Sequence, residues 1–144
     1  MTPKNRLIQR VLIANRGEIA CRIIRTAKAQ GLETVAVYSD ADRLSQHVSL
    51  ADTAVYIGDA APAQSYLNIE ALIQAVNASQ ADAVHPGYGF LAENADFAQA
   101  VIDNGTLWVG PSPDVIRSMG NKARAKDLMQ AAGGTLVKHY RDLA

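Results

Sequence analysis

The feature that most constrains the fold is a regular alternation of short apolar runs with longer segments of helical periodicity. Strands are predicted at residues 11–14, 34–38, 54–57, 81–84 and 106–109, because these runs are apolar or β-branched and end at turn-forming residues. Apolar residues recur at helical spacing in 19–27, 68–77 and 94–102. Strands separated by helical segments of about ten residues form parallel βαβ units with right-handed crossovers. The predicted fold class is α/β, a three-layer α/β/α Rossmann-like open, mainly parallel sheet.

The chain is expected to carry one main domain followed by the start of another portion. A chain of 144 residues with 49% hydrophobic content is long enough to bury one core. Two further helical segments, 111–119 and 122–132, are separated by Gly120-Asn121. We therefore expect a domain over residues 1–119 and the helical start of a second portion over residues 120–144.

Composition excludes several classes of function. Lysine plus arginine and aspartate plus glutamate both count 14, and the two signs are interspersed, so no basic surface for nucleic acid is predicted. The apolar runs are too short to span a membrane, and the polar segment 1–10 lacks the apolar core of a signal peptide, so a cytoplasmic location is expected. The single Cys21 excludes an internal disulfide, and neither it nor a histidine cluster offers metal-ligand spacing, so it is interpreted as a small apolar helix residue.

Ligands of open parallel sheets bind at the carboxyl ends of the strands, where three segments of this chain stand out. In the first, residues 15–18 (NRGE), Gly17 permits a tight turn and the next helix could present its amides to an anion. Alternatively, Glu18 simply complements the helix dipole. A nicotinamide site is disfavoured, although Asp40 ends the second strand, because Gly17 stands alone where the dinucleotide fingerprint has three glycines.

The second segment, residues 85–94 (HPGYGFLAEN), contains more glycine, aromatic and ionisable residues than a simple connecting loop requires. Gly87 and Gly89 would let the backbone approach a ligand closely, and Tyr88 and Phe90 could wall an apolar pocket. The alternative is a rigid loop whose aromatic rings cap the core. His85 is either a general base or, as we favour, a hydrogen-bonded structural residue.

The third segment, Gly120-Asn121-Lys122, places a lysine at the start of a helix. Its ammonium could point at a phosphate, or it could be an ordinary solvated side chain.

The three segments together carry a resemblance to a known family. Residues 13–20 (IANRGEIA), 85–94 and 119–122 (MGNK), with 65–68 (SYLN) and 109–111 (VGP), resemble biotin carboxylase in the same order. The similarity runs from about residue 10 to 133, and the ten-residue second segment is its most specific part. The chain is therefore similar to the biotin carboxylase N-terminal, pre-ATP-grasp domain found in methylcrotonyl-, geranyl-, propionyl- and acetyl-CoA carboxylase alpha subunits.

The resemblance implies a role in a ligase reaction. In that family ATP activates bicarbonate, and the carboxyl group passes to biotin held on a carrier domain, for later transfer by a carboxyltransferase subunit. ATP, Mg²⁺ and biotin would serve the complete enzyme, and the residues that hold the metal and catalyse the reaction would lie in an ATP-grasp and C-terminal portion outside this chain. The isolated chain is expected to bind no cofactor tightly and not to turn over.

The resemblance also implies roles for residues of this chain. Lys122 corresponds to a lysine that reaches the ATP phosphates, and Gly87, Tyr88 and Gly89 correspond to the border of the biotin pocket. Glu93 and Asn94 would order the loop beneath that border, and Arg22 and Arg25 would face a homodimer partner. After Gly133 the chain departs from the family pattern, since no proline follows Pro113.

Two other hypotheses stay open at the level of sequence. One is a stand-alone Rossmann-like module that binds a nucleotide or a partner protein with its loop ends, and the other is the nicotinamide enzyme disfavoured above. The acceptor of the carboxyl group is not encoded in a segment of this kind, because a separate carboxyltransferase binds it.

Overall fold

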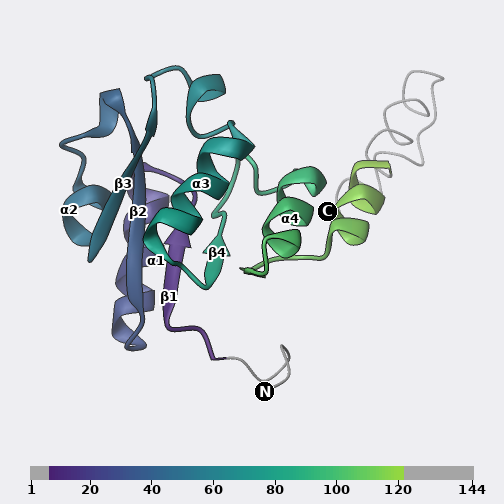
Figure 1. Ribbon diagram of the computed structural model, residues 1–144, viewed down its shortest axis with the longest axis horizontal. Coiled ribbons are helices and arrows are strands. Elements are labelled where there is room, and N and C mark those ends of the chain that lie inside the picture. Colours follow the sequence, from purple (N-terminus) through teal and green to yellow (C-terminus); the bar gives the residue numbers. More distant parts are fainter. Residues whose placement is uncertain (1–6, 122–144) are drawn as a thin grey trace, which may run out of the picture.

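The computed structural model describes residues 7–121 and contains one parallel five-stranded sheet with strand order β3-β2-β1-β4-β5. Figure 1 shows the sheet between two helical layers. The strands are β1 (Arg10–Ile13), β2 (Glu33–Ser39), β3 (Thr53–Gly58), β4 (Ala83–His85) and β5 (Leu107–Trp108). All pairings are parallel, so the predicted α/β class is confirmed.

The helices divide between the two faces of the sheet according to the direction of the crossovers. On one face lie α1 (Gly17–Ala29) and α2 (Gln46–Leu50), which follow β1 and β2; on the other lie α3 (Ile69–Ser79) and α4 (Ala95–Asp103), which follow β3 and β4 (Figure 1). The chain thus builds one half of the sheet outward from β1, then returns past β1 to build the other half. This reversal creates a topological switch point between β1 and β4.

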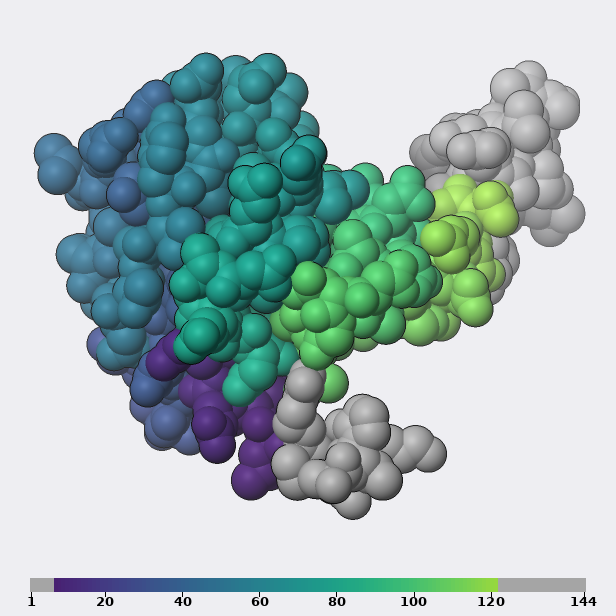
Figure 2. All heavy atoms as spheres, viewed as in Figure 1, coloured from purple at the N-terminus to yellow at the C-terminus, as the bar shows by residue number. Residues whose placement is uncertain are grey.

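The two faces of the sheet are packed with side chains of different size. Under α3 and α4 the buried cluster contains large residues, among them Leu12, Leu72 and Phe97, and Trp108 meets the Phe97 ring edge-on at 5.5 Å. Under α1 the buried cluster includes four alanines and only short or branched aliphatic side chains, so the helix can approach the sheet closely. In the space-filling view α3, in teal, and α4, in green, lie in the middle of the visible face, with blue atoms of earlier residues beside them on the left (Figure 2).

Asparagine caps fix the start of both helices of the front layer. The side-chain oxygen of Asn68 accepts the amide hydrogen of Ala71, and that of Asn94 accepts the amide hydrogen of Phe97. Asn68 therefore caps α3, and Glu70 lies in the first turn of that helix. A cap of this kind is worth about 1 kcal/mol. By contrast, α1 begins without a side-chain cap, and its first turn points at the switch point.

Local structure differs from the sequence prediction in short elements and at one helix. The five-residue α2 and the 3-10 turns at Asp40–Asp42 and Pro62–Gln64 were not predicted, because they are too short to show a period. Residues 113–121 form a helix that continues through Gly120 and Asn121, so the predicted helix break at that pair is absent. The domain boundary expected near Gly120 stays a prediction.

Within residues 7–121 no helix is long and apolar enough to cross a membrane. Cys21 lies buried on α1, as predicted for a small apolar residue, and burial raises the pKa of its thiol.

Candidate functional site

The candidate site lies at the switch point, where the loops after β1 and β4 leave the sheet side by side. Asn15, which follows β1, is 1% exposed and joins the two loops. Its side-chain amide donates to the carbonyl oxygens of Pro86 at 2.9 Å and Tyr88 at 2.7 Å, and its Oδ1 accepts the amide hydrogen of Arg16. One buried side chain therefore sets the path of the whole 86–88 segment.

The two glycines of this loop have the same backbone conformation but different surroundings. Gly87 has a φ of +69° and Gly89 a φ of +71°, in the left-handed region. A Cβ at Gly87 would lie 2.7 Å from the side-chain nitrogen of Asn15, whereas a Cβ at Gly89 would have no atom within 4 Å. Gly87 is thus required by packing within the protein, and Gly89 leaves open space at the surface. The next residue, Phe90, is held at a positive φ of 46° without being glycine.

Tyr88 is presented to solvent at the end of an apolar groove. Its side chain is 74% exposed. The groove has a volume of about 470 Å³ and runs between α1 and the β4-β5 half of the sheet, with Ile19, Arg22 and Val109 among its lining residues. Exposure of an aromatic ring beside an apolar hollow is typical of a ligand or partner site.

His85 lies at the base of the loop and is held as a neutral ring. Its Nδ1 accepts the amide hydrogen of Gly87 at 3.0 Å, and burial lowers its pKa. Its backbone oxygen accepts the amide hydrogen of Ala14. These contacts support the structural interpretation of His85 over the general-base one.

A buried carboxylate, Asp42, accepts hydrogen bonds from two side chains of other connections at this end of the sheet, Arg16 and Tyr66. Arg16 donates to its Oδ1 at 2.8 Å and the Tyr66 hydroxyl donates to its Oδ2 at 2.8 Å. Burial opposes ionisation of Asp42, but the hydrogen bonds from Tyr66 and Arg16 outweigh it and hold its pKa below the usual range. Burial and the bond to Asp42 raise the pKa of the Tyr66 hydroxyl, so it stays a donor. The Tyr66 ring stacks on Phe90 with centroids 5.1 Å apart.

Sequence reasoning did not single out Asp42 or Tyr66 as site residues. Tyr66 stood within the 65–68 segment that carries part of the family resemblance, and Asp42 follows the second predicted strand by a few residues. Neither position shows a pattern of its own, because the contact between them depends on how two separate connections fold over the same end of the sheet.

The remaining predicted residues are distributed around the loop. Glu93 is exposed, and Asn94 caps α4 as described. Arg22 is exposed beside the groove, while Arg25 forms an ion pair with Glu18 at 3.3 Å. Lys122 lies outside the described residues. Asp40, the acid of the disfavoured nicotinamide hypothesis, is paired with Arg43 at 3.1 Å.

Comparison with known proteins gives relatives over most of the chain. Residues 7–116 match the family model described as biotin carboxylase, N-terminal domain. The methylcrotonoyl-CoA carboxylase subunit alpha of Arabidopsis thaliana is 53% identical over 140 residues, which are 97% of this chain and 19% of that protein. The biotin carboxylase of Pseudomonas aeruginosa is 57% identical over 127 residues, 88% of this chain and 28% of that protein.

Solved structures share both fold and sequence with this chain. The Kluyveromyces lactis urea carboxylase aligns with a TM-score of 0.80 and 47% identity, over 88% of this chain and 11% of that one. The biotin carboxylase domain of Hydrogenobacter thermophilus 2-oxoglutarate carboxylase aligns with a TM-score of 0.78 and 46% identity, over 90% of this chain and 28% of that one. The chain thus spans a small part of the length of the proteins that it matches. By the extent of the family match and by its fold, this chain belongs to the biotin carboxylase N-terminal domain family.

Proposed function

We propose that this chain acts as the N-terminal domain of a biotin carboxylase, in the ATP- and bicarbonate-dependent carboxylation of carrier-bound biotin. The observation that carries the proposal is the loop Gly87-Tyr88-Gly89, which a buried asparagine holds at the switch point with its tyrosine exposed. Its sequence lies within the family match and its position is where open parallel sheets bind ligands.

The loop suits the border of a biotin pocket. The space around Gly89 is open, so a flat ureido ring can approach the main chain there. Tyr88 offers an exposed aromatic face to the apolar part of the ligand, beside the groove that it lines together with His85. Bound biotin supplies the ring nitrogen that takes the carboxyl group. The residues of this chain would orient the ring and cover one side of it.

ATP and Mg²⁺ would be bound mainly by parts of the complete enzyme beyond the described residues. We keep the proposal that Lys122 neutralises charge on the ATP phosphates. Within residues 7–121, no group of three or more histidine, cysteine or acidic side chains is arranged to hold a metal ion. From the family resemblance, the magnesium ligands are proposed to lie in the ATP-grasp portion.

The partners of the chain are proposed from the same family. They are the ATP-grasp and C-terminal portions of the carboxylase, a biotin carrier domain and a carboxyltransferase subunit. A homodimer contact through Arg22 and Arg25 stays a proposal, as does the supporting role of Glu93 and Asn94 beneath the loop.

Relatives with different names are about equally similar to this chain. Those named methylcrotonoyl-CoA carboxylase and biotin carboxylase are 53% and 57% identical to it. The cytoplasmic location expected from the sequence is a proposal, and the relatives from Arabidopsis thaliana and Mus musculus are named as mitochondrial.

Calorimetry with MgATP tests the proposal. We would compare this chain with a version extended through an ATP-grasp domain, each with Lys122→Ala and with Lys28→Ala as a control at an exposed lysine of α1. We expect only the extended chain to bind, and only Lys122→Ala to weaken binding. Binding by the 144-residue chain alone would instead support the stand-alone nucleotide-binding module.

A further inference from the structure

The carboxylate of Asp42 is the centre of a hydrogen-bonded cluster at the carboxyl end of the sheet. Asp42 is 4% exposed, and besides Arg16 and Tyr66 it accepts hydrogen bonds from the hydroxyls of Ser39 and Ser45. A buried carboxylate needs such donors to stay ionised. The cluster therefore fixes the Tyr66 hydroxyl, and with it the plane of the Tyr66 ring.

The Tyr66 ring is in turn the surface on which Phe90 rests. The two rings are stacked, with an interplanar angle of 20°, and the Tyr66 side chain is fully enclosed, at 2% exposure. Phe90 adopts a left-handed φ of 46°, which a bulky residue keeps only where its surroundings hold it there. Phe90 directly follows Gly89, so its position fixes one end of the 87–89 segment. Asn15 fixes the other end.

We propose that Arg16, Asp42 and Tyr66 are positioning residues that hold the 87–89 segment in its ligand-binding conformation through Phe90. We name these four side chains the brace. The proposal deepens the proposed function and rests on it where biotin is concerned, because the brace acts on the segment assigned to the biotin border. None of its members needs to touch the ligand. The chemistry that the brace supports is recognition of a flat heterocycle by main chain and Tyr88.

Hydrogen exchange in this chain tests the mechanical part of the proposal without any ligand. Tyr66→Phe keeps the stacked ring but removes its bond to Asp42. Loss of one hydrogen bond to a charged group should speed exchange of the amides at 87–91 about tenfold. The control Tyr38→Phe removes a hydroxyl from a ring that packs against Tyr56 and Arg43 instead. Equal exchange in the two variants would overturn the brace.

A second variant separates the brace from simple backbone strain. Phe90→Gly removes the side chain that is unfavourable at positive φ. If backbone strain alone mattered, the loop amides of the variant would exchange more slowly than those of the wild type. The brace predicts the opposite, faster exchange at 87–89, because the stacking partner of Tyr66 is lost. Urea unfolding of each variant checks that it is folded, and slower exchange in Phe90→Gly would contradict the proposal.

Kinetics in a full-length carboxylase carrying this domain tests the functional part. Tyr66→Phe should raise KM for free biotin by the factor by which the variant lowers the population of the closed loop, a population that the exchange rates give, and leave KM for MgATP unchanged. If the closed population falls but KM for biotin does not rise by that factor, the brace stands and the biotin assignment of the loop fails. If loop exchange is unchanged, the brace fails whatever the kinetics show.

Discussion

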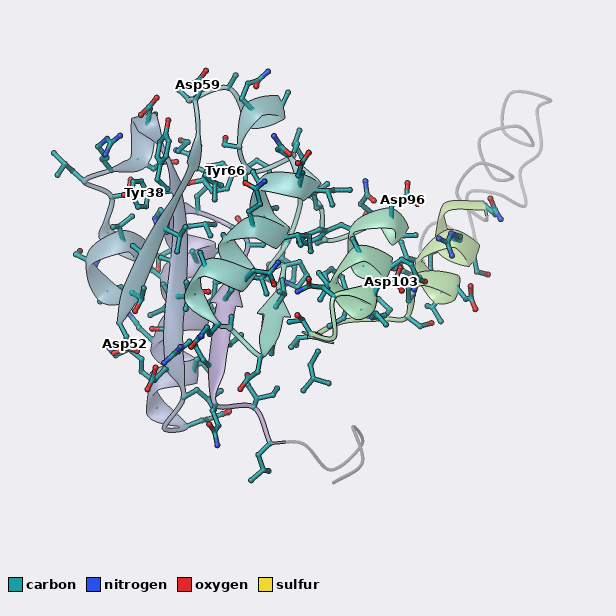
Figure 3. All side chains as sticks on the ribbon, in the orientation of Figure 1. Tyr38, Asp52, Asp59, Tyr66, Asp96 and Asp103 are labelled. Atoms are coloured by element: carbon teal, nitrogen blue, oxygen red, sulfur yellow. The ribbon has the colours of Figure 1, made fainter. Side chains whose placement is uncertain are left out.

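The two ends of the sheet use polar side chains in different ways. At the amino end, acidic side chains accept hydrogen bonds from backbone amides at the starts of strands. The Asp82 carboxylate accepts the amide hydrogens of Gln9 and Arg10, and Asp52 accepts that of Thr34. At the carboxyl end, Asn15 and Asp42 bind one loop to another. Figure 3 marks the two ends with Asp52 and Tyr66.

The two ends use backbone at positive φ in different ways. At the amino end Gly31, Gln80 and Gly105 stand singly, each just after a helix, whereas at the carboxyl end Gly87, Gly89 and Phe90 lie within one loop. Glycine adopts this conformation readily, but Phe90 keeps it only because its surroundings hold it there, and the same loop leaves the Tyr88 ring exposed. The polar contacts at the amino end secure the strands, whereas those at the carboxyl end hold the loop that we propose as the ligand site. Substitutions at both ends test this difference, from the largest expected effect to the smallest.

Gly87→Ala should be the most damaging of these substitutions. The new Cβ would meet both Asn15 at 2.7 Å and Ile19 at 3.0 Å, at a φ of +69°, so we expect a loss of about 2–4 kcal/mol in the free energy of unfolding. Gly89→Ala has the same backbone strain but open space around it, and should cost about 1 kcal/mol. Urea unfolding measures both. Equal costs would mean that packing against Asn15 does not distinguish the two glycines.

Asp42→Asn should cost about 2 kcal/mol at pH 7, because Arg16 loses its buried ionic partner. Its pKa in the folded protein lies below the unfolded value, so the carboxylate contributes fully above the unfolded pKa of about 3.9 and loses this contribution as pH falls further. Between pH 6 and pH 3 the variant should therefore lose less stability than the wild type. If the free energy of unfolding of Asp42→Asn fell with pH as steeply as that of the wild type, the acid sensitivity would belong to other groups.

Asp52→Ala tests the amino end and should cost about 1 kcal/mol, the net value of the bonds to the Thr34 amide and hydroxyl. Those hydrogen bonds also hold the pKa of Asp52 below its usual range. Loop exchange at 87–91 should be unaffected, since the contacts lie at the opposite end of β2. The control is Asp59→Ala, at an exposed carboxylate (Figure 3). Faster exchange at 87–91 in Asp52→Ala would show that the two ends are coupled.

Glu33→Gln should have the smallest effect. The carboxylate pairs with Arg10 at 2.7 Å, but the two side chains are 60% and 34% exposed, and pairs of this kind are worth about 0.5 kcal/mol or less. Thermal or urea unfolding at low and high salt measures the loss, which should shrink with salt. A loss above that of Asp52→Ala would reverse the expected order at the amino end.

Sequence periodicity determined the parallel α/β architecture, the order of the main elements and the Asn68 cap, because these depend on local spacing and on side chains a few residues apart. The ten-residue segment 85–94 carried the family resemblance in the same way. Only the tertiary structure decided that the Asn15 side chain forms hydrogen bonds with the loop after β4. The same holds for the packing of Gly87, and not Gly89, against Asn15. The tertiary structure also brought Asp42 to Arg16 and Tyr66, 26 and 24 residues away along the chain. Those contacts arise where separate crossover connections converge at one end of the sheet, and no local pattern encodes that convergence.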